Sequence, residues 1–237
     1  GDGIILVCPS KVADAKMKMY NLDGSEGKMC GNGIRCVGKF LYDHGMVDIN
    51  EKDEITIETL SGIKKLKAYT SGGKVNRLRV DMGKAILEPK EIPVVLDGDK
   101  VVDRPVEIAG KNYNITCVSM GNPHCVVFMD DIDNLDIETV GPEFENDKLF
   151  PERVNTEFVT VLDDHTIKMR VWERGSGETW ACGTGACAVA VAACENGFCK
   201  KGEDIKIKLK GGDLIINYTD ETVYMTCLLY TSPSPRD

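Results

Sequence analysis

A short glycine-rich motif occurs twice in the chain, and the sequence around it repeats as well. Cys30-Gly31-Asn32-Gly33 has a near-copy in Cys182-Gly183-Thr184-Gly185. The stretches before the two cysteines match in register, Lys16-Met17-Lys18, Tyr20 and Glu26 corresponding to Lys168-Met169-Arg170, Trp172 and Glu178. A register held over this length indicates two related halves, each presenting one thiol at the end of a glycine-rich turn.

The hydrophobic pattern changes after each cysteine. Short alternating runs precede it, whereas Ile34, Val37 and Leu41 follow with helical spacing, and Gly45 and Gly197 stand where the two helices should stop. We therefore predict an α+β fold with two pseudo-symmetric domains. Each domain is a set of mostly antiparallel strands wrapped around a central, uniformly apolar helix, with the active site in the cleft between the domains.

The domain limits follow from the proline-rich stretch 88–105, which is predicted to cross between the halves. We place the first domain at 1–90 and the second at 91–227. The run Gly3–Val7 is predicted to be a buried strand, and residues 228–237 resemble a foreign tail. Asn122 and Asn155 are predicted to lie in turns.

Composition limits the classes of partner. The 237 residues carry a net charge of −9 with scattered lysines, which does not favour nucleic acid. Apolar runs such as Ala186–Ala193 are too short to span a bilayer, and no signal peptide opens the chain. Several of the ten cysteines lie in apolar runs without zinc spacing. We expect a cytoplasmic protein without disulfides, metal, membrane or nucleic-acid partner.

The two thiols suggest a particular chemistry. A helix N-terminus offers free N–H groups and the positive end of the helix dipole, which bind a carboxylate and lower the pKa of a thiol. Two such thiols on opposite faces of one carbon can invert its configuration: one thiolate removes the α-proton and the other thiol returns a proton. This scheme requires no pyridoxal lysine, metal or other cofactor.

Each candidate residue also has a purely structural interpretation. Most cysteines in a cytosolic protein fill the core, and the catalytic interpretation of Cys30 and Cys182 depends on their equivalence. Cys36 and Cys187 lie inside the helical patterns, so packing is the better interpretation for them.

The polar candidates also have two interpretations each. His124 could poise a thiol or satisfy a backbone group. The pair Glu173 and Arg174 could be a solvated surface, but it lies at the same distance before Cys182 as Asn21 does before Cys30, which favours the cleft. For the asparagines, turn formation and ligand contact remain open alternatives.

These motifs together resemble the diaminopimelate epimerases, a family of isomerases independent of pyridoxal phosphate. The resemblance covers about residues 1–226. It rests on an extended first signature and four later motifs in the same order: Asn21-x-Asp23-Gly24-Ser25-x4-Cys30-Gly31-Asn32-Gly33-x-Arg35, Gly121-Asn122-Pro123-His124, Arg153-Val154-Asn155-Thr156-Glu157, Trp172-Glu173-Arg174-Gly175 and Ala181-Cys182-Gly183-Thr184-Gly185.

The resemblance implies interconversion of LL- and meso-2,6-diaminopimelate in lysine biosynthesis, without a cofactor, by a homodimer. It implies Cys30 and Cys182 as the acid/base thiols, poised by His124 and Glu173. Arg174 is the natural partner of the distal carboxylate. The substrate-binding residues implied are Asn21, Gly31, Asn32, Asn122, Asn155, Glu173, Arg174, Gly183 and Thr184.

Two departures from the family concern the ends of the chain. Family members begin with a Gly-x-Gly-Asn-Asp-Phe segment and end with a Gly-Pro-containing segment, and neither stands here. We therefore expect a fragment that lacks a first-domain strand and the closing strand, with exposed sheet edges. An inactive chain is one expectation from this. Separately, a plastid location is an alternative to the cytoplasm if the source is a plant or alga.

Two other functions stay open. Proline or hydroxyproline racemases share the paired thiols but typically carry His where Asn32 stands, so Asn32 argues against them. A non-catalytic small-molecule binder or a thiol redox protein is the alternative from another class.

Overall fold

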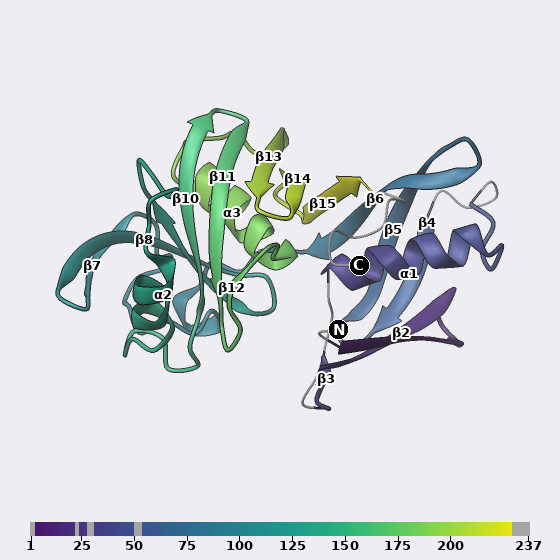
Figure 1. The fold of residues 1–237 in the computed structure, drawn as a ribbon, viewed down its shortest axis with the longest axis horizontal. Coiled ribbons are helices and arrows are strands. Elements are labelled where there is room, and N and C mark those ends of the chain that lie inside the picture. The colour runs from purple at the N-terminus through teal and green to yellow at the C-terminus, as the bar shows by residue number, and fades with distance from the viewer. Residues whose placement is uncertain (1–2, 22–23, 28–30, 50–53, 229–237) are drawn as a thin grey trace. The chain divides into compact units, whose positions relative to one another are not determined.

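The computed structural model describes residues 3–21, 24–27, 31–49 and 54–228, and leaves the side chains of Asn21, Asn32 and Leu228 undescribed (Figure 1). Cys30 lies outside the described residues. The chain forms two compact units, one containing the described residues up to Asp81 and those from Thr226, the other Met82–Met225. The predicted domain limits stay a prediction.

In the described residues, the first unit is a six-stranded sheet with one helix. Five strands have the order β1-β2-β4-β5-β6, β3 pairs with β2, and the β2–β4 pair is parallel whereas the other pairs are antiparallel. Helix α1 contacts β4 and β5. The elements are β1 (Gly3–Cys8), β2 (Ala15–Asn21), β3 (Glu26–Gly27), α1 (Gly31–Asp43), β4 (Glu54–Thr59), β5 (Gly62–Ser71) and β6 (Lys74–Gly83).

The second unit holds more strands and two α-helices. The strand order is β15-β14-β13-β11-β10-β9-β8-β7, and the β9–β10 and β11–β13 pairs are parallel. The elements are η1 (Pro89–Glu91), β7 (Arg104–Ile108), β8 (Lys111–Ser119), β9 (Pro123–Phe128), α2 (Ile137–Glu145), β10 (Asn155–Asp163), β11 (Thr166–Glu173), β12 (Gly177–Thr179), α3 (Gly183–Glu195), β13 (Asp204–Leu209), β14 (Gly212–Tyr218) and β15 (Val223–Leu228).

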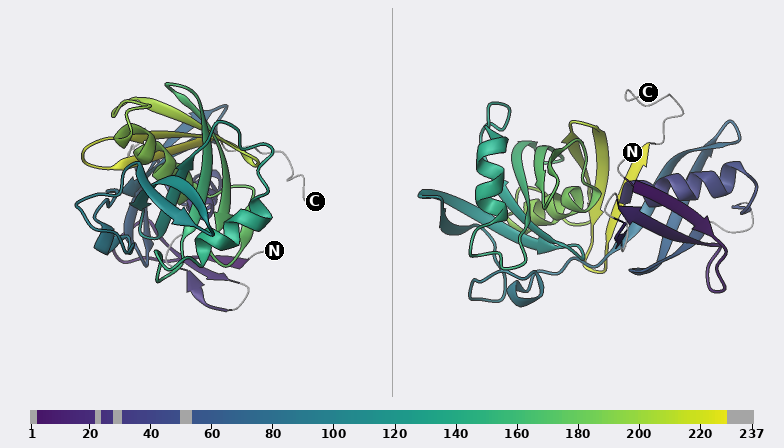
Figure 2. Two further views of the ribbon diagram at one scale, coloured as in Figure 1. Left: turned by 90° about the vertical axis from the view of Figure 1, so that its left-hand side faces the viewer. Right: turned by 60° about the horizontal axis from the view of Figure 1, so that its bottom comes forward.

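Helix α3 lies inside the strands of its unit, whereas α2 lies outside them (Figures 1 and 2). Strands β8, β9, β10, β13 and β14 contact α3, and its residues from Gly185 to Ala193 are all buried. A second buried cluster lies against α2, where Phe144 packs edge-on against Phe158. The predicted α+β class is confirmed, and none of the described helices is long and apolar enough to cross a membrane.

The matching residues of the sequence repeat have matching places in the two units. In the first, β2 and β3 pair so that Tyr20 stands opposite Glu26, and in the second, β11 and β12 pair so that Trp172 stands opposite Glu178. Each short hairpin is followed by a helix, and β2 and β11 each pair in parallel with the strand that follows that helix. The local sequence similarity therefore corresponds to the same strand–turn–helix order.

Three expectations about where residues lie are wrong. Strand β1 is exposed, with Ile4 64% accessible, because it is the edge strand of its sheet and apolar character alone does not bury a residue. Helix α1 is apolar on one face only, so Cys36 points to solvent instead of packing. Asn155 does not lie in a turn but begins β10, where it is buried.

Candidate active site

Cys182 is the N-cap of α3, as the sequence predicted for a thiol after a glycine-rich turn. Its backbone is extended (φ −122°, ψ 111°), and its sulfur accepts a hydrogen bond from the Gly185 N–H at 3.4 Å. The sulfur also lies 3.5 Å from Thr184 Oγ1. A cysteine in this position occupies the place of a capping serine, so its sulfur faces the unpaired amides and the positive end of the helix.

Four polar side chains connect this cysteine to the core of the unit. Asn122, in the bend before β9, donates from Nδ2 to Thr184 Oγ1 at 3.3 Å, and its Oδ1 lies 3.1 Å from His124 Nε2. His124 Nδ1 lies 2.7 Å from Glu157 Oε1. The structure thus brings three of the predicted site residues, Asn122, His124 and Thr184, together with Cys182.

Glu157 is the functional candidate that the sequence analysis did not single out. It is fully buried in β10 together with its partner His124. Burial raises the pKa of Glu157, and the charge and hydrogen bond of His124 oppose that rise. The signal available in the sequence was a carboxylate directly before the mostly apolar strand Phe158–Leu162, where burial of an unpaired charge would be costly.

The environment of Cys182 favours the thiol over the thiolate. Burial raises its pKa well above the ordinary value, and the charges of Glu173 and Glu157 add to the rise. The hydrogen bonds from Thr184 and Gly185 act in the opposite direction. A bound substrate that brings its own ammonium group near the sulfur would shift the balance towards the thiolate.

The turn after β11 is held by two buried polar residues. Asn155 donates from Nδ2 to the Pro123 carbonyl at 2.8 Å and accepts from the Arg174 N–H at 3.0 Å. Glu145 accepts from Trp172 Nε1 at 2.7 Å and from the Gly175 N–H at 2.9 Å. Asn155 therefore ties the start of β9 to the Arg174 turn, while its predicted contact with substrate stays a prediction.

The two charged residues of that turn have different partners. Glu173 accepts a hydrogen bond from the Thr179 hydroxyl, and its charge acts on Cys182. The Arg174 guanidinium is partly exposed and donates to the Glu152 carbonyl at 2.8 Å. This carbonyl contact can be exchanged for a carboxylate, which is the stronger partner of an arginine.

The candidates in the first half are only partly described. Asn21 is the last residue of β2, and Gly31 and Asn32 begin α1. Gly31 is buried, and its carbonyl accepts from Arg35 Nε at 3.1 Å. The start of a helix directly after the first cysteine is therefore as predicted.

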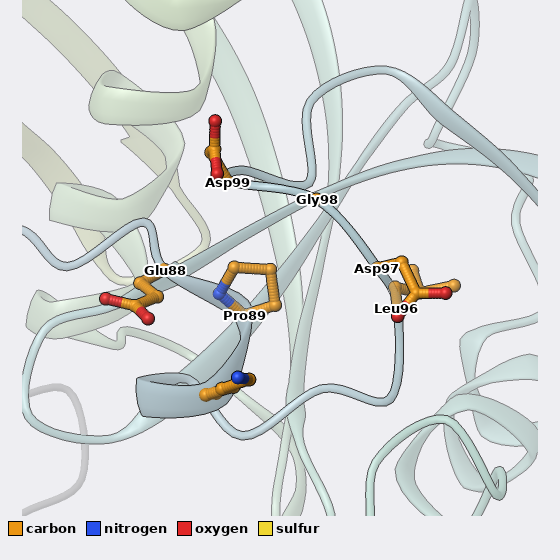
Figure 3. Close-up of a pocket in the computed structure, with 7 residues that line it drawn as sticks. Glu88, Pro89, Leu96, Asp97, Gly98 and Asp99 are labelled. Atoms are coloured by element: carbon orange, nitrogen blue, oxygen red, sulfur yellow. The ribbon is translucent and has the colours of Figure 1, made fainter.

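A hollow of about 460 Å³ lies in the loops near η1, away from these residues. It is lined by Glu88, Pro89, Lys90, Leu96, Asp97, Gly98 and Asp99 (Figure 3). It includes none of the predicted site residues. Among the described residues, no group of three or more His, Cys, Asp or Glu side chains is placed to hold a metal ion.

Solved structures with this fold define its class. A probable proline racemase from Agrobacterium radiobacter with bound carbonate aligns with a TM-score of 0.71 at 17% identity, covering 99% of this chain and 77% of that one. A phenazine biosynthesis protein of the PhzF family from Bacillus anthracis aligns with a TM-score of 0.65 at 18% identity, covering 97% of this chain and 83% of that one. The chain therefore has the fold of the racemase and PhzF proteins.

Closer sequence relatives identify the family within that class. The family described as diaminopimelate epimerase matches residues 1–88 and 116–228. The diaminopimelate epimerase of Desulfovibrio desulfuricans is 52% identical over 233 residues, which cover 95% of this chain and 79% of that protein. That of Methanococcus maripaludis is 51% identical over 227 residues, with 95% and 80% covered. The chain belongs to the diaminopimelate epimerase family.

Proposed function

We propose that this chain is an isomerase that interconverts LL- and meso-2,6-diaminopimelate in lysine biosynthesis. Relatives that carry this activity in their names are about half identical to the chain over nearly all of its length. The observation that carries the proposal in the structure is the Cys182 thiol at the N-terminus of the buried helix α3. A proline racemase function has less support, because those proteins share the fold at 17% identity or less.

The first part of the mechanism concerns the carboxylate of the reacting centre. The N–H groups of Gly183 and Thr184 open α3 and lack helical partners, so they are suited to bind the carboxylate oxygens. Negative charge develops on those oxygens when the α-proton leaves. Donors already aimed at that charge lower the barrier most where water is excluded, as around the buried Cys182.

The second part is the proton transfer itself. Cys182 acts on one face of the α-carbon, and Cys30 is the second thiol, on the opposite face. In one direction Cys30 removes the proton as thiolate and Cys182 donates one as thiol, and in the other direction the roles reverse. The protons balance, and the enzyme ends each turnover with the opposite thiol charged.

The remaining candidates recognise the substrate and poise the thiols. Asn122 lies next to Thr184, so its amide is close to the same carboxylate site. Arg174 is assigned the distal carboxylate, and Glu173 an ammonium group of the substrate. His124 poises Cys182 through Asn122. Asn21, Gly31 and Asn32 are assigned the corresponding roles beside Cys30, and Asn155 the remaining substrate contact.

The setting of the enzyme is also a proposal. The cytoplasm is the compartment that the sequence predicts, because several cysteines lie in apolar runs, as expected of free thiols. A homodimer is the assembly that the family resemblance implies. Light scattering on the purified chain tests it, and a monomer at all working concentrations would exclude it.

The decisive experiment is α-proton exchange in D2O, followed by NMR under reducing conditions. We expect LL-diaminopimelate to exchange and to become the meso isomer, and L-proline to remain unchanged. Cys182→Ala and Cys30→Ala should each reduce epimerisation by about 10²–10⁴-fold, the contribution of a positioned acid or base. The matched control Cys36→Ala changes an exposed cysteine of α1 and should leave the rate unchanged.

The outcomes separate the alternatives. Exchange with proline alone would move the chain to the racemases. Full turnover by either cysteine variant would exclude the two-thiol mechanism. No exchange with either amino acid would contradict the proposed function.

A further inference from the structure

The buried pair of His124 and Glu157 is the end of a hydrogen-bond chain that leads to the Cys182 sulfur. Both side chains are fully buried, and their Nδ1 and Oε1 atoms are 2.7 Å apart. The contacts then pass through Asn122 and Thr184 to the sulfur. Every residue of this hydrogen-bond chain lies within the second unit.

From His124 Nε2 onwards, the hydrogen bonds can all run in one direction, towards the Cys182 sulfur. A carboxylate only accepts, so His124 donates its Nδ1–H to Glu157. Asn122 gives its Nδ2–H to Thr184, which leaves its Oδ1 to accept from His124 Nε2. With Glu157 ionised, this pattern uses both ring nitrogens of His124 as donors. Thr184 accepts from Asn122, and its own O–H remains to be donated to the Cys182 sulfur.

We propose that Glu157 is a positioning residue that sets the direction of these hydrogen bonds, so that the donors on His124 Nε2, Asn122 and Thr184 point towards the Cys182 sulfur. Its carboxylate stabilises the doubly protonated imidazole, and the imidazole fixes the Asn122 amide. The amide in turn frees the Thr184 hydroxyl hydrogen for the sulfur. The inference deepens the proposed function, because it rests on Cys182 as a reacting thiol.

The opposite direction would have the opposite effect on the thiol. With a singly protonated His124, Nε2 becomes an acceptor and the Asn122 amide must rotate to donate to it. Thr184 then donates to Asn122 and offers only a lone pair to the sulfur. A lone pair needs an S–H partner, so this direction stabilises the thiol, whereas the proposed one stabilises the thiolate.

The packing around Glu157 shows that its position is specified. A Cβ on Gly185 would lie 2.6 Å from Glu157 Oε1, so only glycine leaves room for the carboxylate under the first turn of α3. Glu157 Oε2 is buried and has no hydrogen-bond partner among the residues that the structure describes. A buried carboxylate that gives up part of its hydrogen bonding is costly, which argues against a role in stability alone.

Two other titratable groups, Glu173 and Cys125, lie near this hydrogen-bond chain. Glu173 faces Cys182 from the end of β11, and its charge also acts on Glu157. Cys125 in β9 lies near Glu157, and burial raises its pKa well above the ordinary value, so it stays a neutral thiol. The His124–Glu157 pair as a whole is neutral. Its effect on Cys182 is therefore carried mainly by the direction of the hydrogen bonds.

The test is the pH dependence of Cys182 alkylation by iodoacetamide, followed by peptide mass in the full chain. Glu157→Gln keeps the shape and an acceptor for His124 but removes the charge that holds the second ring proton. We expect the midpoint of the Cys182 alkylation profile to rise by about one pH unit, which corresponds to the contribution of one hydrogen bond to a charged group. Thr184→Val should give a similar rise, and the double variant no further rise.

The sign of the shift decides between the explanations. If Glu157 acted only as an isolated negative charge, its neutralisation would lower the midpoint, and this result would overturn the proposal. An unchanged midpoint in both single variants would reduce Glu157 to a packing group. Glu195→Gln, the same change at the far end of α3, is the control and should leave the midpoint in place.

Alkylation needs no turnover, so it distinguishes this proposal from the proposed function. Proton exchange with LL-diaminopimelate, measured on the same variants, should show a lower kcat with KM within about twofold for Glu157→Gln. If the unchanged chain does not exchange, the proposed function fails while the alkylation result still stands. A normal exchange rate with no alkylation shift would overturn this inference alone.

Discussion

Helices α1 and α3 begin with the same kind of motif but lie in different surroundings. Both start one residue after a cysteine, at the end of a short hairpin. In α3 every residue from Gly185 to Ala193 is buried by strands on several sides. In α1 the buried face contains Ile34, Val37 and Leu41, whereas Phe40 is 42% exposed.

The start of a helix and its burial are two separate properties, although the sequence repeat suggests both for each half. A helix begins within the Cys-Gly-x-Gly motif in each half, because that geometry is local. Whether the helix is enclosed depends on how many strands surround it and on the rest of its sequence. Lys39 and Asp43 form an ion pair on α1, while α3 carries no charge before Glu195.

The largest effect is expected from a charge placed on each helix. Ala190→Lys puts an ammonium group at a fully buried site of α3, and we expect it to cost more than about 4 kcal/mol and to unfold the second unit. Phe40→Lys on α1 should cost less than about 1 kcal/mol. Urea unfolding followed by circular dichroism measures both, and equal losses would contradict the difference between the helices.

Alanine at a glycine of each helix should give an intermediate effect. In Gly185→Ala the new Cβ meets the fixed Glu157 carboxylate, so we expect a loss of about 1–3 kcal/mol and reduced epimerisation. In Gly38→Ala it meets a Leu66 methyl group at 2.9 Å, which can move, and alanine favours the helix by about 1 kcal/mol. Thermal melts should show a clear loss only for Gly185→Ala. Similar losses at both sites would mean that Glu157 can move as easily as a leucine.

The smallest effect concerns the equivalent glutamates of the two hairpins. Burial raises the pKa of Glu178, but hydrogen bonds from Arg170 and Lys210 outweigh it and lower the pKa overall. Glu26 is exposed. We expect Glu178→Gln to cost about 1–2 kcal/mol at neutral pH and Glu26→Gln almost nothing.

The acid dependence follows from the sign of that shift. A lowered pKa means that the ionised Glu178 stabilises the folded state above its ordinary value of 4.5. This stabilisation is lost as the pH falls through the lowered pKa. Unfolding measured from pH 7 to pH 3 should show the loss in the unchanged chain and in Glu26→Gln, but not in Glu178→Gln. A parallel decline in all three would assign the acid sensitivity to other groups.

The sequence by itself determined the local elements and the place of Cys182. The shift from alternation to helical spacing set the start of α3, and Gly197, with φ +79°, ends it as expected of a residue that must adopt a left-handed conformation. The glycine-rich turn before each helix was likewise visible in the repeat. These features depend on residues that are close together in the sequence, so they can be predicted from it.

Only the tertiary structure decided which side chains meet at the thiol. His124 and Glu157 lie on the parallel strands β9 and β10, and the register that pairs Asn155 with His124 brings the carboxylate to the imidazole. The same register buried Asn155, and the sheet edge left β1 exposed. Strand pairing between distant segments depends on the packing of the whole unit, so no local pattern in the sequence could specify these contacts.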